Sequence, residues 1–85
     1  MKAKAGDNVI IRTVTYHYTG QIEAIDGDTI ALTDAAWIAD SGRWSSALQT
    51  GHLSVVEPYP HGVEVARAAI VDISPWAHDL PRDAR

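Results

Sequence analysis

The sequence contains no cysteine, which excludes a disulfide framework and any site that needs a thiolate as metal ligand or nucleophile. Phenylalanine is also absent, so three tryptophans and three tyrosines supply all the aromatic bulk. These rings carry polar groups and suit half-buried or interfacial positions. No apolar run approaches the length of a membrane span, and the first residues, MKAKAGDN, lack the apolar segment of a secretory signal. We therefore expect a cytoplasmic protein with no membrane partner.

Basic residues are scarce in the body of this chain of 85 residues, which has a formal net charge of −4. Between residues 5 and 80 there are three bases, Arg12, Arg43 and Arg67, against ten acids. Binding along a phosphate backbone usually requires a basic patch or stripe. Extended nucleic acid is therefore disfavoured as a partner, although arginines from several subunits could still surround a small anion.

The motifs of common enzymes and metal sites are missing as well. The histidines at positions 52, 61 and 78 have no HxH or HExxH spacing. There is also no GxSxG motif and no glycine-rich phosphate loop. We expect no cofactor and no metal site, and the sequence favours a protein that is not an enzyme.

The most informative stretch that is present is Val9–Trp37. Its β-branched and aromatic residues are typical of strands, and short polar segments around Thr19-Gly20 and Asp26-Gly27-Asp28 indicate turns. The first predicted strand has polar and apolar residues on both faces, which is typical of a bent strand. The pattern predicts three consecutive antiparallel strands, over residues 8–18, 21–25 and 29–33.

The second half of the chain predicts one short helix and further strands. Asp40-Ser41 is a good N-cap pair and Gly51 a typical helix stop, so we expect a helix over residues 42–50. Further strands are expected over residues 53–57, 63–66 and 69–73, the last of which continues the fifth strand or starts a sixth. The prediction is a single, mainly β domain. It comprises a polar lead-in (1–7), a small bent antiparallel sheet or barrel of five to six strands with the inserted helix (8–74), and an extended tail (75–85).

Tyr16-His17-Tyr18 is the densest cluster of polar and aromatic residues. In a strand, His17 points away from the two tyrosines, which share a face. In the structural interpretation, the tyrosines are half-buried and His17 faces solvent or a neighbouring subunit. In the functional interpretation, the tyrosines form a stacking platform for a planar ligand, and His17 is a hydrogen-bonding partner.

The segment from Trp37 to Trp44 is the second candidate. Asp40, Ser41 and the first amides of a helix could bind a polar group there, with Arg43 pairing to an anion. The structural alternative is a capped helix whose two tryptophans cover the opening of the barrel.

Arg67 interrupts an apolar run, which predicts a buried guanidinium that needs a carboxylate or an anionic ligand. Asp34, Glu64 and Asp72 are possible partners, and Arg12 in the first strand raises the same question. Taken together, the candidate ligand-binding residues are Arg12, Tyr16, His17, Tyr18, Trp37, Asp40, Ser41, Arg43, Trp44 and Arg67.

The passage GQIEAIDGDTIALTDA, Gly20–Ala35, resembles the strand-turn-strand core of Sm-like proteins. In that family a bent five-stranded sheet closes on itself, and subunits join edge to edge into rings. The resemblance covers about a fifth of the chain. The run RTVTYHYTG, DAAWIADSGRW and VEPYP also looks like uncharacterised small proteins of phages and prophages.

These observations lead to one functional expectation and two alternatives. We expect a phage-type, homo-oligomeric binding module, a ring if the resemblance holds, with a small nucleotide-like anion in pockets between subunits. Sequestering a host signalling nucleotide in the host cytoplasm would fit such a protein. The alternatives are a virion or assembly protein that acts through protein contacts alone, and an RNA-binding Sm-like ring.

Overall fold

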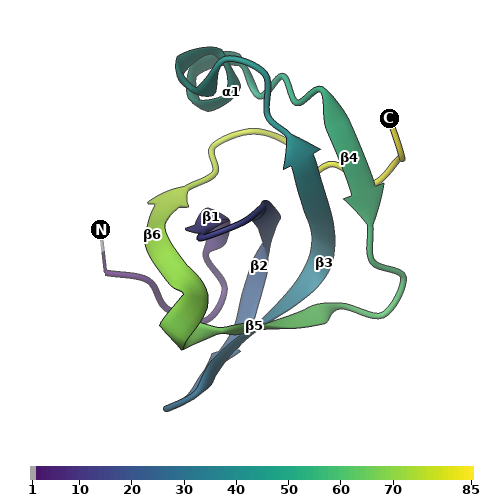
Figure 1. The fold of residues 1–85 in the computed structure, drawn as a ribbon. Helices are drawn as coiled ribbons and strands as arrows, with labels where there is room; N and C mark the ends of the chain where they lie inside the picture. The colour runs from purple at the N-terminus through teal and green to yellow at the C-terminus, as the bar shows by residue number, and fades with distance from the viewer. Residues whose placement is uncertain (1) are drawn as a thin grey trace.

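The structure is a computed structural model that describes residues 2–85. In this part the chain forms six strands, one α-helix and one turn of 3₁₀ helix (Figure 1). In chain order the elements are β1 (Asn8–Thr13), β2 (His17–Ile25), β3 (Thr29–Asp40), α1 (Trp44–Thr50), β4 (Val55–Pro58), β5 (Val63–Ala66), η1 (Arg67–Ala69) and β6 (Ile70–Pro75).

All six strands belong to one antiparallel sheet, with the order β4-β3-β2-β1-β6 and with β5 paired to β3. The long strand β3 has two partners: its first residues, 29–32, pair with β5, and residues 36–40 pair with β4. Between these segments Asp34 has a φ of 55°, a left-handed value that bends the strand. The strands curl around a common interior (Figure 1). The predicted class, a mainly β bent sheet with one short inserted helix, is confirmed.

The first hairpin differs from the prediction of a single strand over residues 8–18. The chain turns between β1 and β2, where the Thr13 amide and hydroxyl both donate to the Tyr16 carbonyl, at 3.0 and 2.5 Å. Thr19 and Gly20 consequently lie inside β2 instead of in a turn. The turn sequence Val-Thr-Tyr contains none of the Gly, Pro, Asn or Asp residues that mark most turns. The sequence pattern therefore gave no sign of a turn here.

Other boundaries follow the sequence more closely. The Asp-Gly turn between β2 and β3 is confirmed, since Asp26 Oδ1 accepts hydrogen bonds from the amides of Asp28 and Thr29, at 3.0 and 2.9 Å. The helix ends where expected, with Gly51 at a φ of 80°. Strand β3 continues to Asp40, well beyond the predicted end at residue 33, because its second half has β4 as a partner.

Buried side chains form two separate cores on opposite faces of β1. The inner core lies inside the curled sheet and includes Val9 and Ile11 of β1. The outer core lies between the sheet, α1 and the C-terminal tail, and includes Ile10 of β1. Strand β1 is therefore buried on both faces, and its three consecutive apolar residues have no exposed surface. The inner core comprises Val9, Ile11, Ile22, Ile30, Leu32, Ala35 and Val65; the outer core comprises Ile10, Ala36, Ile38, Ala47, Leu53, Val56, Trp76 and Leu80.

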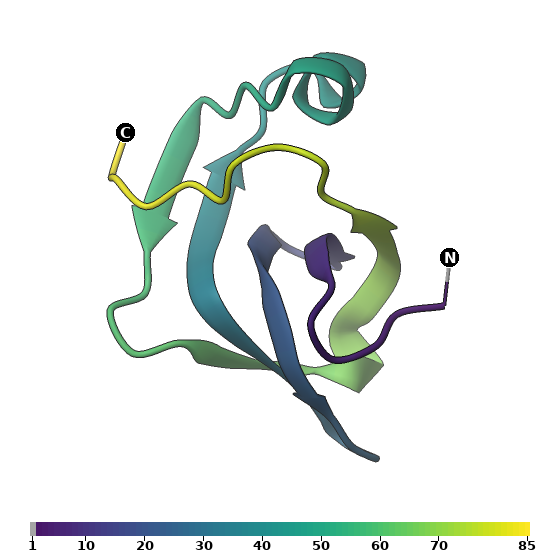
Figure 2. The same cartoon turned by 180° about the vertical axis from the view of Figure 1, so that it is seen from behind.

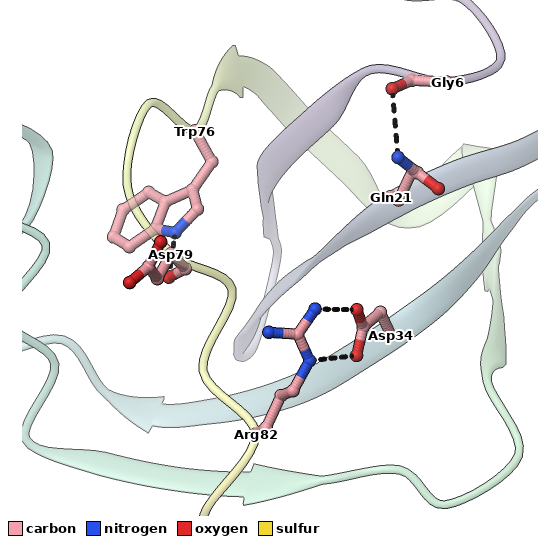
Figure 3. Close-up of polar contacts among 6 residues, drawn as sticks. All are labelled: Gly6, Gln21, Asp34, Trp76, Asp79 and Arg82. Carbon is pink, nitrogen blue, oxygen red and sulfur yellow. Dashed lines mark hydrogen bonds and ion pairs between the residues drawn. The ribbon is translucent and has the colours of Figure 1, made fainter.

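The C-terminal tail, residues 76–85, runs back across the sheet towards β4 (Figure 2). Trp76 and Leu80 anchor it in the outer core, and the indole N–H of Trp76 donates to the Asp79 carbonyl at 3.1 Å (Figure 3). Further along, Arg82 forms an ion pair with Asp34 (Figure 3). At the end, Arg85 and Val56 exchange two backbone hydrogen bonds. The tail thus covers the free edge of β4 and is part of the packed structure.

The lead-in, residues 2–7, is held against β2 by hydrogen bonds. The Gly6 amide donates to the Ile22 carbonyl at 2.8 Å, and the Gln21 side chain donates to the Gly6 carbonyl at 3.3 Å (Figure 3). Ala3 packs against the inner core. These contacts fix the beginning of the described chain at one end of the curled sheet.

Candidate functional site

Arg12, His17 and Trp44, three of the predicted site residues, lie together at the rim of the outer core. Arg12 is directly opposite His17 across the β1–β2 pair and opposite Asp72 across the β1–β6 pair. The Trp44 ring from α1 covers this row, with its centroid 5.3 Å from Arg12 Cζ and 5.4 Å from the His17 ring centroid. The row thus combines a cation–π contact with an aromatic edge contact.

Asp72 neutralises the charge of Arg12 in this cluster. Arg12 Nε donates to both carboxylate oxygens at 3.0 Å, and a terminal guanidinium nitrogen also contacts Oδ2. The hydrogen bonds from Arg12 hold the pKa of Asp72 below its ordinary value, and Asp72 raises the pKa of Arg12. An incoming anion would have to displace Asp72, so the geometry fits a structural pair better than a free anion site.

The tyrosines on either side of His17 have separate partners. The Tyr16 ring meets the Trp37 ring edge-to-face, with centroids 4.7 Å apart, while Tyr18 stacks on Tyr59 at 6.3 Å. His17 points away from both, towards Trp44. Burial, together with the neighbouring Tyr18, raises the pKa of Tyr59. These rings therefore occupy one another's faces and edges instead of forming one open platform.

The loop before α1 differs from the predicted helix cap. The N-cap position is Arg43, which makes no side-chain capping hydrogen bond, and α1 begins at Trp44. The Asp40 carboxylate accepts a hydrogen bond from the Gly42 amide at 2.8 Å, and the Ser41 hydroxyl donates to the Gly42 carbonyl at 3.0 Å. Asp40 and Ser41 thus stabilise the turn into the helix instead of capping it. Trp44 packs on the outer core.

Arg67 also lies in a different environment from the predicted one. It is exposed at the start of η1, and no carboxylate within residues 2–85 forms an ion pair with it. One terminal nitrogen donates to the backbone carbonyl of Asp26 at 2.6 Å. The apolar run around Arg67 predicted burial, but η1 interrupts the run between β5 and β6 and directs this residue outward.

A cavity of about 490 Å³ opens beside Arg67, at the end of the sheet where the lead-in lies. Its apolar wall consists of Ala3, Ile25, Ile30, Ile70 and Ile73. The two charged residues that line it are Lys2 and Arg67. This volume lies within the range of small-molecule sites, about 300–1,000 Å³.

Three other cavities contain carboxylates. The largest, about 670 Å³, lies along the tail and is lined by two aspartates and two arginines. One of about 330 Å³ contains the Asp34–Arg82 pair, and one of about 540 Å³ contains Glu23 and Glu64. Among these four cavities, the one at Arg67 alone combines cations, apolar walls and no carboxylate.

The ten predicted site residues therefore do not form one site. Arg12, His17 and Trp44 are brought together, Tyr16 contacts Trp37, and the others lie in the α1 loop, at Tyr59 or on η1. Sequence reasoning missed Lys2 and the four isoleucines of the cavity, because apolar strand residues carry no sign of which ones line a cavity.

Metal-binding and membrane-spanning features are not found within residues 2–85. No group of three His, Asp or Glu side chains there could hold a metal ion. No helix in that range has the length and apolar character needed to cross a bilayer.

Comparisons of the chain with protein-family models, with curated proteins and with solved structures give no match.

Proposed function

We propose that this protein is a non-enzymatic binding module that holds a small anionic ligand in the cavity between Lys2 and Arg67. The observation that supports this most is the charge of the lining. An acidic chain with a formal net charge of −4 has here a cavity whose charged side chains are both cationic. Opposite charge in a partly enclosed site attracts and orients an anion.

The hydrogen bonds around Arg67 leave donors for such a ligand. One terminal nitrogen is used by the Asp26 carbonyl, and a guanidinium has five N–H groups in total. The Asp26 carboxylate accepts hydrogen bonds from the amides of its own turn, and the charge of Arg67 adds to the lowering of its pKa, but it forms no ion pair with Arg67. A planar guanidinium matches a carboxylate or phosphate with two parallel hydrogen bonds, and Lys2 adds a second positive charge.

Calorimetric titration with small carboxylates, phosphates and nucleotides tests the proposal. Arg67→Ala should weaken binding of the anion that binds by about tenfold or more, since a hydrogen bond to a charged group is lost. Arg43→Ala is the matched control, because Arg43 is also exposed but lines none of the four cavities. Binding that is unchanged in Arg67→Ala, or weakened equally in Arg43→Ala, would contradict the proposal.

Association of copies is the second part of the proposal, and the outer edge of β6 supports it. Strand β6 pairs with β1 on one side, and no strand within residues 2–85 pairs with its other side. One exposed valine belongs to this strand: Val71 is 58% exposed. Unpaired edges with apolar side chains are common association sites.

Native mass spectrometry measures this association. Val71→Lys should shift the protein towards the monomer, because it places a charge on the edge. Val55→Lys is the control, since Val55 is also exposed but lies on β4, whose edge is covered by the tail. A wild-type protein that is monomeric at all concentrations would exclude this part of the proposal.

The finer expectations from the sequence stay predictions: a phage-type protein, a nucleotide ligand, a ring and a cytoplasmic location. Oligomers that bind no anion would favour the assembly role. Oligonucleotide binding that weakens steeply with salt would favour the RNA-binding ring.

A further inference from the structure

The wall of the Arg67 cavity is entirely aliphatic. Ile25, Ile30, Ile70 and Ile73 contribute branched side chains, and Ala3 closes the surface from the lead-in. The chain has six aromatic residues, and none of them lines this cavity. They contact one another, Arg12 and His17, or the outer core instead.

This wall is poorly suited to a nucleobase. Proteins bind bases by stacking them on aromatic or guanidinium planes and by hydrogen bonds to their polar edges. The cavity has no aromatic ring, its one guanidinium is that of Arg67, which pairs with the anionic group in the proposed function, and none of its lining residues is Ser, Thr, Asn or Gln. A base would lose its hydrogen bonds to water here without replacing them, which is unfavourable.

The wall is well suited to an aliphatic chain. Ile30 is almost fully buried and belongs to the inner core, while Ile70 and Ile73 pack against that core. Ile25 is 38% exposed near the tip of the β2–β3 hairpin. A chain that enters the cavity would therefore extend the inner core outward and remove exposed apolar surface from water.

We infer that the ligand is an aliphatic carboxylate of medium chain length, with its tail against the four isoleucines and its carboxylate between Lys2 and Arg67. This inference rests on the proposed function, because it uses the same two cations. A dry apolar cavity of about 150 Å³ holds a benzene ring, so about 490 Å³ accommodates a body roughly three times as large. Octanoate and decanoate are of suitable size.

Methyl NMR titration with hexanoate, octanoate, decanoate, octanol and adenosine monophosphate tests this inference. We expect octanoate to shift the Ile25, Ile30, Ile70 and Ile73 methyl signals. Each added methylene should strengthen binding by roughly fourfold until the cavity is full. Octanol should bind more weakly, because it lacks the charge that Lys2 and Arg67 recognise.

Two matched variants locate the tail of the ligand. Ile25→Asn should weaken octanoate binding about fivefold or more, because it places an amide in the apolar wall. Leu48→Asn should leave binding unchanged, since Leu48 is equally exposed, at 37%, but lies on α1. Both residues are at the surface, so amide spectra can confirm that each variant folds.

The outcomes separate the inference from the function on which it rests. Arg67-dependent binding of adenosine monophosphate without binding of carboxylates would overturn the inference and leave the proposed function standing. Equal binding of octanol and octanoate would overturn the role of the cations. Isoleucine methyl signals unmoved by every anion would overturn both.

Discussion

Arg12 and Asp72 face each other across the β1–β6 pair, and Arg12 Nε donates to both carboxylate oxygens at 3.0 Å. The same guanidinium lies against the Trp44 ring. The side chains of this ion pair are 39% and 42% exposed, and pairs at this level of exposure usually contribute little alone. The contact with Trp44 gives Arg12 a second role that Asp72 lacks.

This asymmetry predicts unequal effects of the two residues on stability. Arg12→Ala should lower the free energy of unfolding more than Asp72→Asn does, because it removes the contact with Trp44 as well as the ion pair. Urea unfolding of both variants and of the double variant measures the difference. Equal losses in the two single variants would mean that the packing of Arg12 on Trp44 contributes nothing.

The carboxylates of Asp26 and Asp72 should make the protein less stable in acid. Hydrogen bonds from the Thr29 and Asp28 amides lower the pKa of Asp26, and hydrogen bonds from Arg12 lower that of Asp72. A carboxyl whose pKa is lower in the folded state stabilises the fold above its unfolded pKa, about 3.9, and loses that contribution as the pH falls towards the folded value.

We therefore expect the free energy of unfolding to fall as the pH decreases from about 5 through 4 and below. The decrease should be smaller in Asp26→Asn and Asp72→Asn, in which one of these carboxyl groups is absent. Urea unfolding at a series of pH values measures these slopes. Slopes identical to that of the wild-type protein would show that neither carboxylate titrates with a lowered pKa.

A side chain at Gly20 should clash with the neighbouring strand inside the sheet. A Cβ atom at this position would lie 3.0 Å from Leu32 Cβ and 3.2 Å from the Thr33 carbonyl oxygen. Gly20→Ala should therefore destabilise the protein by about 1–3 kcal/mol, which is typical of overpacking. Gly27→Ala is the control, because a Cβ there meets no atom within 4 Å and should change stability by less than about 0.5 kcal/mol. Similar losses in both variants would contradict the close approach of β2 and β3.

Truncating Leu80, which anchors the C-terminal tail, should destabilise the whole protein. Leu80 is 7% exposed in the outer core, so Leu80→Ala should lower the free energy of unfolding by about 2–5 kcal/mol. Leu48→Ala, at a position 37% exposed, should cost less than about 0.5 kcal/mol. Thermal or urea unfolding measures both. A neutral Leu80→Ala would show that the tail does not dock on the sheet.

The sequence predicted the parts of the fold that local patterns encode. The Asp-Gly turn, the strand over residues 63–66 and the helix stop at Gly51 have specific local signals. The hairpin at residues 14–16 has none, because its turn residues are ordinary strand formers. The length of β3 depends on its pairing with β4, a partner distant in the sequence that a local pattern does not reveal.

The candidate site was harder to predict for a related reason. Polar and aromatic residues are the usual sequence signs of a binding site, and these signs favour Tyr16, His17 and Trp44. In the fold these side chains contact other aromatic rings, Tyr16 with Trp37 and His17 with Trp44, whereas the cationic cavity is built mostly from isoleucines. Arg67 was identified, but as a buried residue, because the short η1 turn that exposes it has no clear signal.

The burial of β1 on both faces has a consequence for how this strand finds its place. The inner core takes two side chains of this strand, Val9 and Ile11. A slip of one residue would turn every side chain to the opposite face and place Asn8 or Arg12 at one of these two positions, where a polar group is unfavourable. The same slip would move Arg12 away from Asp72 and leave both charges without their partner. The apolar run and the ion pair at its end thus favour the same alignment, and the pair acts as a second lock on it.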